Sequence, residues 1–161
     1  MKRILIAICI LLLFLSGCTS QNKVSFEEQA YAYYSVFENL YAASPGLNTD
    51  STYLVMDLTN AKLHDQETLI ALMQDFCDEN GYVLMLDTIA GLTEKGFIAD
   101  LSFREGIVIA FDDVRLGNSV FITEAMKWRS GDDAVGAKYT VILRHNAWEI
   151  IRTNNSWMSL K

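Results

Sequence analysis

The chain opens on two basic residues, Lys2 and Arg3, which are followed by an uncharged apolar run over residues 4–15. A transmembrane helix needs about 20 apolar residues to cross a bilayer, and this run is shorter. Small residues follow it. A basic start, a short apolar run and small residues are typical of a cleaved secretory signal. We therefore expect residues 1–17 to be removed and to take no part in the fold.

The junction Leu15-Ser16-Gly17-Cys18 resembles the signal of bacterial lipoproteins, which signal peptidase II cuts before the cysteine. The resemblance implies that Cys18 is the lipidation site, that it carries palmitate-type acyl chains, and that the protein is anchored on the extracytoplasmic face of the cell membrane. Two or more acyl chains make such attachment durable. The expected organisation is a signal peptide over residues 1–17, a lipidated tether over 18–24 and one domain over 25–161.

The charge balance narrows the choice of partners. The chain has 13 basic and 20 acidic residues, and its formal net charge is −7. Loss of Lys2 and Arg3 leaves 11 basic residues and a formal charge of −9. This excess repels phosphates and anionic lipid headgroups. We expect no nucleic-acid partner, and we expect the lipid at Cys18, rather than a basic patch, to hold the protein to the membrane.

Cysteine use excludes a disulfide framework. Cys9 leaves with the signal and Cys18 is the expected lipid site, so Cys77 is the remaining thiol of the mature chain. One thiol cannot form an intramolecular disulfide or a cysteine-based zinc site. Because Cys77 follows Met73 at helical spacing, we expect it to be a small buried core residue rather than a nucleophile.

The two histidines give no catalytic signal. His64 and His145 lie in predicted loops, outside any recognisable nucleophile motif. They also lack the i, i+4 spacing of a helical zinc site. The sequence therefore predicts no metal and no cofactor.

Hydrophobic periodicity predicts alternating helices and strands in the first half of the chain. Ser25 and Glu28 form a capping-box signature, and Ser44-Pro45-Gly46 ends the first helix. A strand-helix-strand order favours a parallel pair of strands. The predicted helices cover residues 26–43 and 65–80, the predicted strands cover 53–58 and 82–86, and a helical turn follows Asp87.

The second half of the chain reads as hairpins. A two-residue loop at Gly117-Asn118 predicts the pairs Ile109 with Met126 and Ile107 with Trp128. A turn near His145-Asn146 predicts Leu143 beside Trp148 and Val141 beside Ile150. Both apolar faces are expected to lie under the helices. The predicted fold class is α+β: a two-layer domain with helices packed on one face of a mostly antiparallel sheet.

The helix-first order and the closing meander of residues 139–143 and 147–151 resemble the end of domains of the nuclear transport factor 2 type. The likeness covers the C-terminal part of the chain. The strand-helix-strand of residues 53–86 is additional to that pattern. The resemblance implies a small cone-shaped fold and no particular activity, because that fold carries many functions.

The glycine-bearing loop that follows the strand ending at Arg129 is the expected binding site. Lys127 and Arg129 alternate with Trp128 and should project together, and Asp132-Asp133 follow them. Loops on a rigid scaffold commonly carry function. A pair of cations beside backbone amides could receive a carboxylate or an acidic partner.

Two functions remain open at this stage. The first is a membrane-anchored binding or accessory module for a protein, peptide or small ligand, favoured by the anchor and by the absence of catalytic motifs. The second is an envelope-associated hydrolase that uses carboxylates such as Asp113 or Glu124 on the helix-covered face. Two close carboxylates, one of them with a pKa raised by burial, would favour the enzyme.

Overall fold

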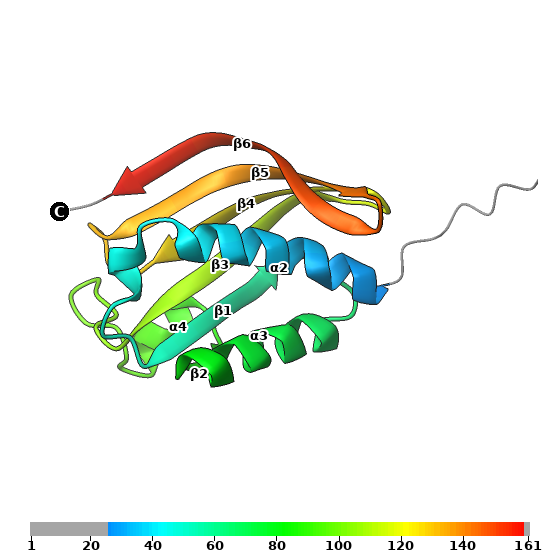
Figure 1. The fold of residues 1–161 in the computed structure, drawn as a ribbon. Coiled ribbons are helices and arrows are strands. Elements are labelled where there is room, and N and C mark those ends of the chain that lie inside the picture. The colour runs from blue at the N-terminus through cyan, green and yellow to red at the C-terminus, as the bar shows by residue number, and fades with distance from the viewer. Residues whose placement is uncertain (1–25, 160–161) are drawn as a thin grey trace, which may run out of the picture.

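The computed structural model describes residues 26–159, and the signal, Cys18 and Ser25 lie outside them. Figure 1 shows helices and one sheet in this part of the chain. The helical elements are α2 (Phe26–Ala42), the short 3₁₀ helix η1 (Pro45–Asn48), α3 (Glu67–Asn80) and α4 (Ile89–Glu94). The strands are β1 (Tyr53–Asn60), β2 (Val83–Leu86), β3 (Gly106–Leu116), β4 (Val120–Trp128), β5 (Ala134–Arg144) and β6 (Ala147–Ser159).

The six strands form one mixed sheet in the order β2-β1-β3-β4-β5-β6. β1 runs parallel to both β2 and β3, while β3 to β6 form an antiparallel meander. The predicted parallel pair on either side of α3 is therefore confirmed. The fold class is α+β, with the antiparallel half of the sheet contributed by the C-terminal hairpins.

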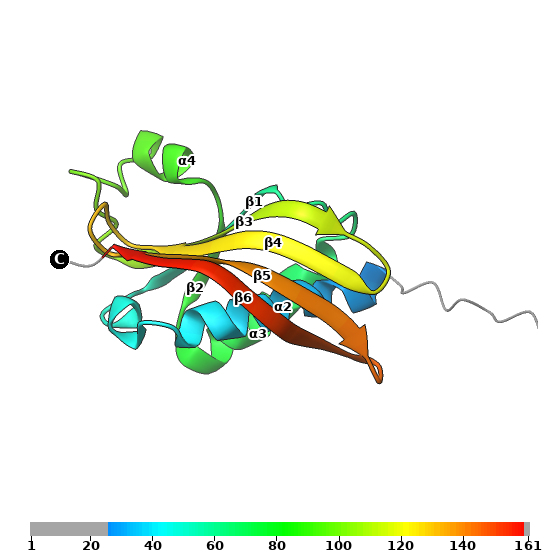
Figure 2. The ribbon, with the colours of Figure 1, turned by 90° about the horizontal axis from the view of Figure 1, so that it is seen from above.

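The helices lie on both faces of the sheet. α2 and α3 are on one face, and α4 is on the other (Figure 2). The main apolar core combines α2 and α3 with inward side chains of the strands, among them Phe37, Met73, Ile109, Phe121 and Val141. The prediction that the helices share one face is wrong for α4. Its Leu92 packs on Val55 and Val108, in a second and smaller cluster.

Helix ends follow local chemistry. Gly81 adopts a left-handed conformation with φ 76°, and its N–H donates to Cys77 O, so α3 ends where the Asn80-Gly81 signal predicts. At its start, Asp65 Oδ1 accepts from Glu67 N at 3.0 Å, which places Asp65 just before the helix rather than within it. Cys77 is fully buried, as predicted, and burial raises the pKa of its thiol to about 11.

The β5–β6 hairpin has the predicted register. Leu143 lies opposite Trp148 and Val141 opposite Ile150. Both turn residues, His145 and Asn146, have positive φ, at 49° and 62°, as the turns that match strand twist require.

The β3–β4 hairpin differs from its predicted register by one residue. The sequence predicts Ile109 and Ile107 as the partners of Met126 and Trp128, and the observed partners are Ala110 and Val108. A one-residue slip exchanges the two faces of a strand. Met126 and Trp128 therefore lie on the face away from α2 and α3, and Lys127 faces the core.

The slip has two local causes. Leu116 pairs with Phe121 and Gly117 N donates to Val120 O at 3.0 Å, so the turn is centred on Asn118-Ser119, one residue later than predicted. The register also shifts between Asp113 and Arg115, which leaves Val114 as an extra residue in β3. Such a bulge changes which residues share a face beyond it.

No helix within residues 26–159 has the length and apolar character that crossing a bilayer requires.

Candidate ligand site on the outer face of the sheet

Lys127, the first residue of the predicted binding site, is fully buried. Its ammonium donates to Tyr41 O at 2.9 Å, to Ser44 O at 3.2 Å, to Asn48 Oδ1 at 2.9 Å and to Ala43 O. Three of these acceptors are carbonyls at the end of α2, where helix carbonyls lack an intrahelical donor. Burial lowers the pKa of Lys127 to about 8. Lys127 thus caps the C-terminus of α2 with a side chain that comes from the interior of the domain.

Arg129 projects to the same side as Lys127, as the alternation predicts. Its guanidinium donates to Leu47 O at 3.2 Å, Thr49 O at 2.5 Å and Arg104 O at 3.0 Å. The two cations therefore fasten the segment that joins α2 to β1 onto the sheet. This use of their donors corrects the hypothesis that the pair receives an acidic ligand.

The remainder of the loop forms a closed turn. Ser130 Oγ donates to Asp133 Oδ2 at 3.2 Å, and Asp132 N donates to the same hydroxyl at 3.3 Å. Gly131 N donates to Leu101 O at 3.0 Å, which ties the loop to the neighbouring turn. Asp132 and Asp133 therefore lie in a self-bonded hairpin connection, and they do not converge with Lys127.

The two carboxylates considered for catalysis lie on opposite faces of the sheet. Asp113 is buried on the α2 side, where its Oδ2 accepts from Tyr33 OH and from Lys62 N at 2.7 Å. Glu124 is exposed on the other face, which corrects its predicted position under the helices. Because the sheet separates them, these carboxylates cannot act on one substrate.

The histidines are exposed, as predicted. Among residues 26–159, no three side chains of the His, Cys, Asp or Glu type are grouped to hold a metal ion.

We call the side of the sheet away from α2 and α3 the outer face. α4 and Phe103 cover the outer face where β1 and β3 begin. Further along these strands, the pairing aligns two rows of residues across the sheet. The polar row is Asn60, Asp112, Glu124, Lys138 and Asn154. The apolar row is Ala110, Met126, Gly136 and Trp157, with Asp57 at its β1 end.

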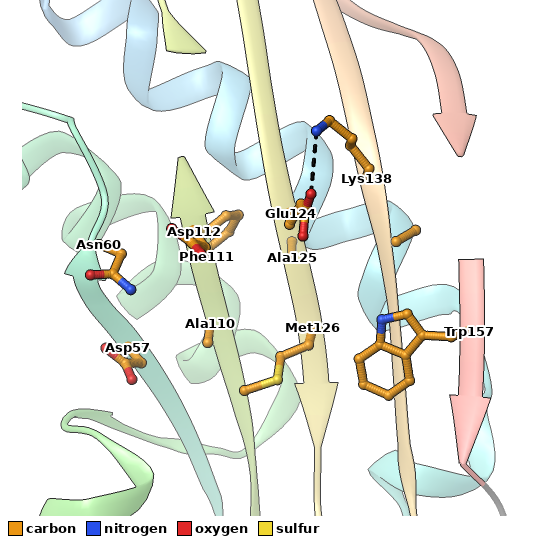
Figure 3. Close-up of a pocket in the computed structure, with 11 residues that line it drawn as sticks. Asp57, Asn60, Ala110, Phe111, Asp112, Glu124, Ala125, Met126, Lys138 and Trp157 are labelled. Carbon is orange, nitrogen blue, oxygen red and sulfur yellow. Dashed lines mark hydrogen bonds and ion pairs between the residues drawn. The ribbon is translucent and has the colours of Figure 1, made fainter. Parts of the chain in front are cut away.

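Most residues of these two rows line a half-open cavity of about 400 Å³. Figure 3 shows Asp57 and Asn60 at the β1 side, Ala110 and Met126 in the middle, and Trp157 at the β6 side. The cavity is within the size range of small-molecule sites, about 300 to 1,000 Å³.

Trp157 lies directly over Gly136. A Cβ atom at Gly136 would be 2.7 Å from Trp157 Cζ2, closer than real contacts allow. Glycine therefore lets the indole approach the strand backbone. Trp157 is still 47% exposed, which leaves a large part of it available to a ligand.

The polar row carries an uneven charge. Lys138 Nζ lies 3.2 Å from Glu124 Oε1. Asp112 lies opposite Glu124 in the register, and within residues 26–159 no hydrogen bond or ion pair reaches its carboxylate. Like charges directly opposite on a sheet are destabilising, so this pair is not explained by stability.

Comparison with known proteins gives no assignment: no family model, no curated protein and no solved structure matches the chain. The likeness to nuclear transport factor 2 domains therefore stays a prediction.

The sequence did not point to this site. Asp112 belongs to an acidic pair that reads as surface charge, and Trp157 follows the meander without a motif. The usable signal was Gly136 within a strand, since a glycine there marks a place where another group approaches closely.

Proposed function

We propose that this protein is a binding module tethered to the extracytoplasmic face of the cell membrane by a lipid on Cys18, and that its ligand occupies the outer-face site. The observation that carries the proposal is the uncovered part of the outer face, where two aligned rows line a half-open cavity beside a half-exposed tryptophan. A concave, largely apolar surface with a few polar groups is the usual form of a ligand site.

A binding role fits these groups better than a catalytic one. General acid–base work on a glycoside or ester needs two carboxylates, or a base and a nucleophile, that converge on the scissile bond. Asp113 is on the covered face, and the two facing carboxylates of the outer-face site, Asp112 and Glu124, are exposed, so neither is buried as a general acid would be. The site instead has an apolar base of Ala110 and Met126, the indole of Trp157 on one side and charged side chains at its edge. Such groups orient a ligand without reacting with it.

The tether is tested by Cys18→Ala. Acylation holds a protein at a membrane through the buried area of its chains, so the variant should leave the membrane fraction. Fractionation after feeding cells a labelled fatty acid measures both effects. Wild type should carry the label and sediment with membranes. An unlabelled wild type, or a variant that still sediments with membranes, contradicts the anchor.

The location of the ligand is tested by photo-crosslinking in intact cells. A benzophenone amino acid placed at position 138, at the rim of the cavity, should give a ligand adduct detectable by mass spectrometry. The same amino acid at position 75, exposed on α3, should not.

Two aromatic variants control the crosslink. Trp157→Ala should abolish the adduct at position 138, while Tyr31→Ala should keep it, because Tyr31 is equally exposed, at 51%, but lies on α2. Equal adducts from both positions, or an adduct that survives Trp157→Ala, would show that the ligand does not use the outer face.

A further inference from the structure

The carboxylates of the outer-face site outnumber its cations. Asp57, Asp112 and Glu124 line the cavity, and Lys138 is the one ammonium among its lining residues. That ammonium lies 3.2 Å from Glu124. The next cations on this face, Arg115 and Arg152, lie at the two ends of the row beyond the cavity, with Ile122 and Thr140 between them. Asp57 and Asp112 therefore leave the site with a negative balance.

The register concentrates this charge at one place. Asp112 has Glu124 opposite it on β4 and the neutral Asn60 opposite it on β1. Its carboxylate meets a like charge on one side and no cation on the other. An ammonium group placed over this row would offset the repulsion and donate a charge-assisted hydrogen bond to the Asp112 carboxylate.

The neighbouring row suits the remainder of such a ligand. Ala110 and Met126 form an apolar surface beside the carboxylates, and the indole of Trp157 borders it. Burying the apolar surface of an alkyl chain against these side chains stabilises its binding. An aromatic face also attracts a cation that lies within about 6 Å of its centroid.

A metal ion does not fit the same place. No group of three metal-ligating side chains occurs in the described part of the chain, whereas hard cations need about six oxygen ligands. An anion would face unpaired carboxylates. Because the chain as a whole is acidic, its field also favours the approach of cations.

We propose that the outer-face site binds a small organic cation, an ammonium group on a short alkyl chain, with the ammonium over Asp112 and the chain against Ala110, Met126 and Trp157. This inference rests on the proposed function and adds the chemical class of the ligand.

Three probes of equal chain length isolate the charge. Pentane-1,5-diamine, pentane-1,5-diol and glutarate present a cation, a neutral group and an anion on the same five-carbon chain. Calorimetric titration of the full-length lipidated protein in detergent micelles measures their affinities. The diamine should bind at least about tenfold more tightly than the diol, as one charge-assisted hydrogen bond allows, and glutarate should not bind.

Two substitutions in the polar row should change the affinity in opposite directions. Asp112→Asn should weaken diamine binding about tenfold, because it removes the carboxylate without changing its shape. Lys138→Gln should strengthen binding severalfold, since it removes the site's own cation and releases Glu124. A damaged fold cannot produce tighter binding. Asp75→Asn on α3 should leave the affinity unchanged.

Indole N–H signals in NMR spectra locate the probe. The chain has three tryptophans, and the diamine should shift the signal of Trp157, which Trp157→Phe identifies. Equal affinity for the diamine and the diol, binding of glutarate, or absence of diamine binding would overturn the cation assignment. In each of those cases, a crosslink at position 138 would still support the outer-face site for another ligand class.

Discussion

Replacing Lys127 with methionine is expected to lower the free energy of unfolding by about 3 kcal/mol. Methionine preserves most of the apolar stem but supplies no donor to Tyr41 O, Ala43 O, Ser44 O or Asn48 Oδ1. The carbonyls at the end of α2 would stay buried without a partner. Each such group costs about 1 to 3 kcal/mol, which exceeds the gain from no longer burying a charge. Urea denaturation measures the difference.

A surface lysine gives the matched control. Lys138→Met removes an ammonium whose partner Glu124 is largely exposed, and such ion pairs contribute about 0 to 1 kcal/mol. If Lys127→Met is as mild as Lys138→Met, then the buried ammonium does not hold the end of α2.

The stability difference between wild type and Lys127→Met should grow as the pH rises above about 8. Burial lowers the pKa of Lys127 from 10.5 to about 8, whereas the unfolded chain keeps the ordinary value. Between these values the folded wild type has lost the proton that its unfolded state still binds, so its free energy of unfolding rises with pH relative to a variant that does not titrate there. The advantage of wild type over Lys127→Met therefore grows between pH 8 and pH 10, and it is constant below pH 8, where both states are protonated. Denaturation of both proteins from pH 7 to pH 10 tests the sign.

Gly136→Ala is expected to destabilise the domain by about 2 kcal/mol and to displace Trp157. The added Cβ would lie 2.7 Å from Trp157 Cζ2 and 3.0 Å from Ala125 O. The oxygen belongs to the backbone of a paired strand and cannot retreat, so the indole must move away from the sheet. Trp157 should become more exposed, and its indole N–H signal should shift.

Gly46→Ala is the matched control, because no atom lies within 4 Å of the position that its added methyl group would take. It should change stability by less than about 0.5 kcal/mol. A Gly136→Ala protein as stable as Gly46→Ala, with Trp157 unmoved, would mean that glycine is not needed under the indole.

Sequence reasoning succeeded where the deciding contacts are local. The His145-Asn146 turn fixes the register of β5 and β6, because both of its residues reach positive φ. Gly117-Asn118 offers the same signal, yet the turn is centred one residue later and β3 carries an extra residue at Val114. Nothing in the composition of β3 marks that bulge.

The same slip explains why the outer-face site was not predicted. It moves Met126 out of the core and brings Lys127 in. The acceptors of Lys127 lie about eighty residues earlier in the chain, so no sequence window contains both. From the sequence alone, a lysine beside a loop is predicted to be a surface cation. In the structure, Lys127 caps the C-terminus of α2.

One hydrogen bond links the first helix of the described chain to the start of its last strand. Trp148 Nε1 on β6 donates to Glu28 O in the first turn of α2, at 2.5 Å. Tension applied to the chain before Phe26 therefore enters the domain through α2 and β6 together, instead of unwinding the helix turn by turn. Trp157 is on that same strand. Under the proposed anchor, mechanical load from the membrane and occupancy of the outer face would act on a single strand.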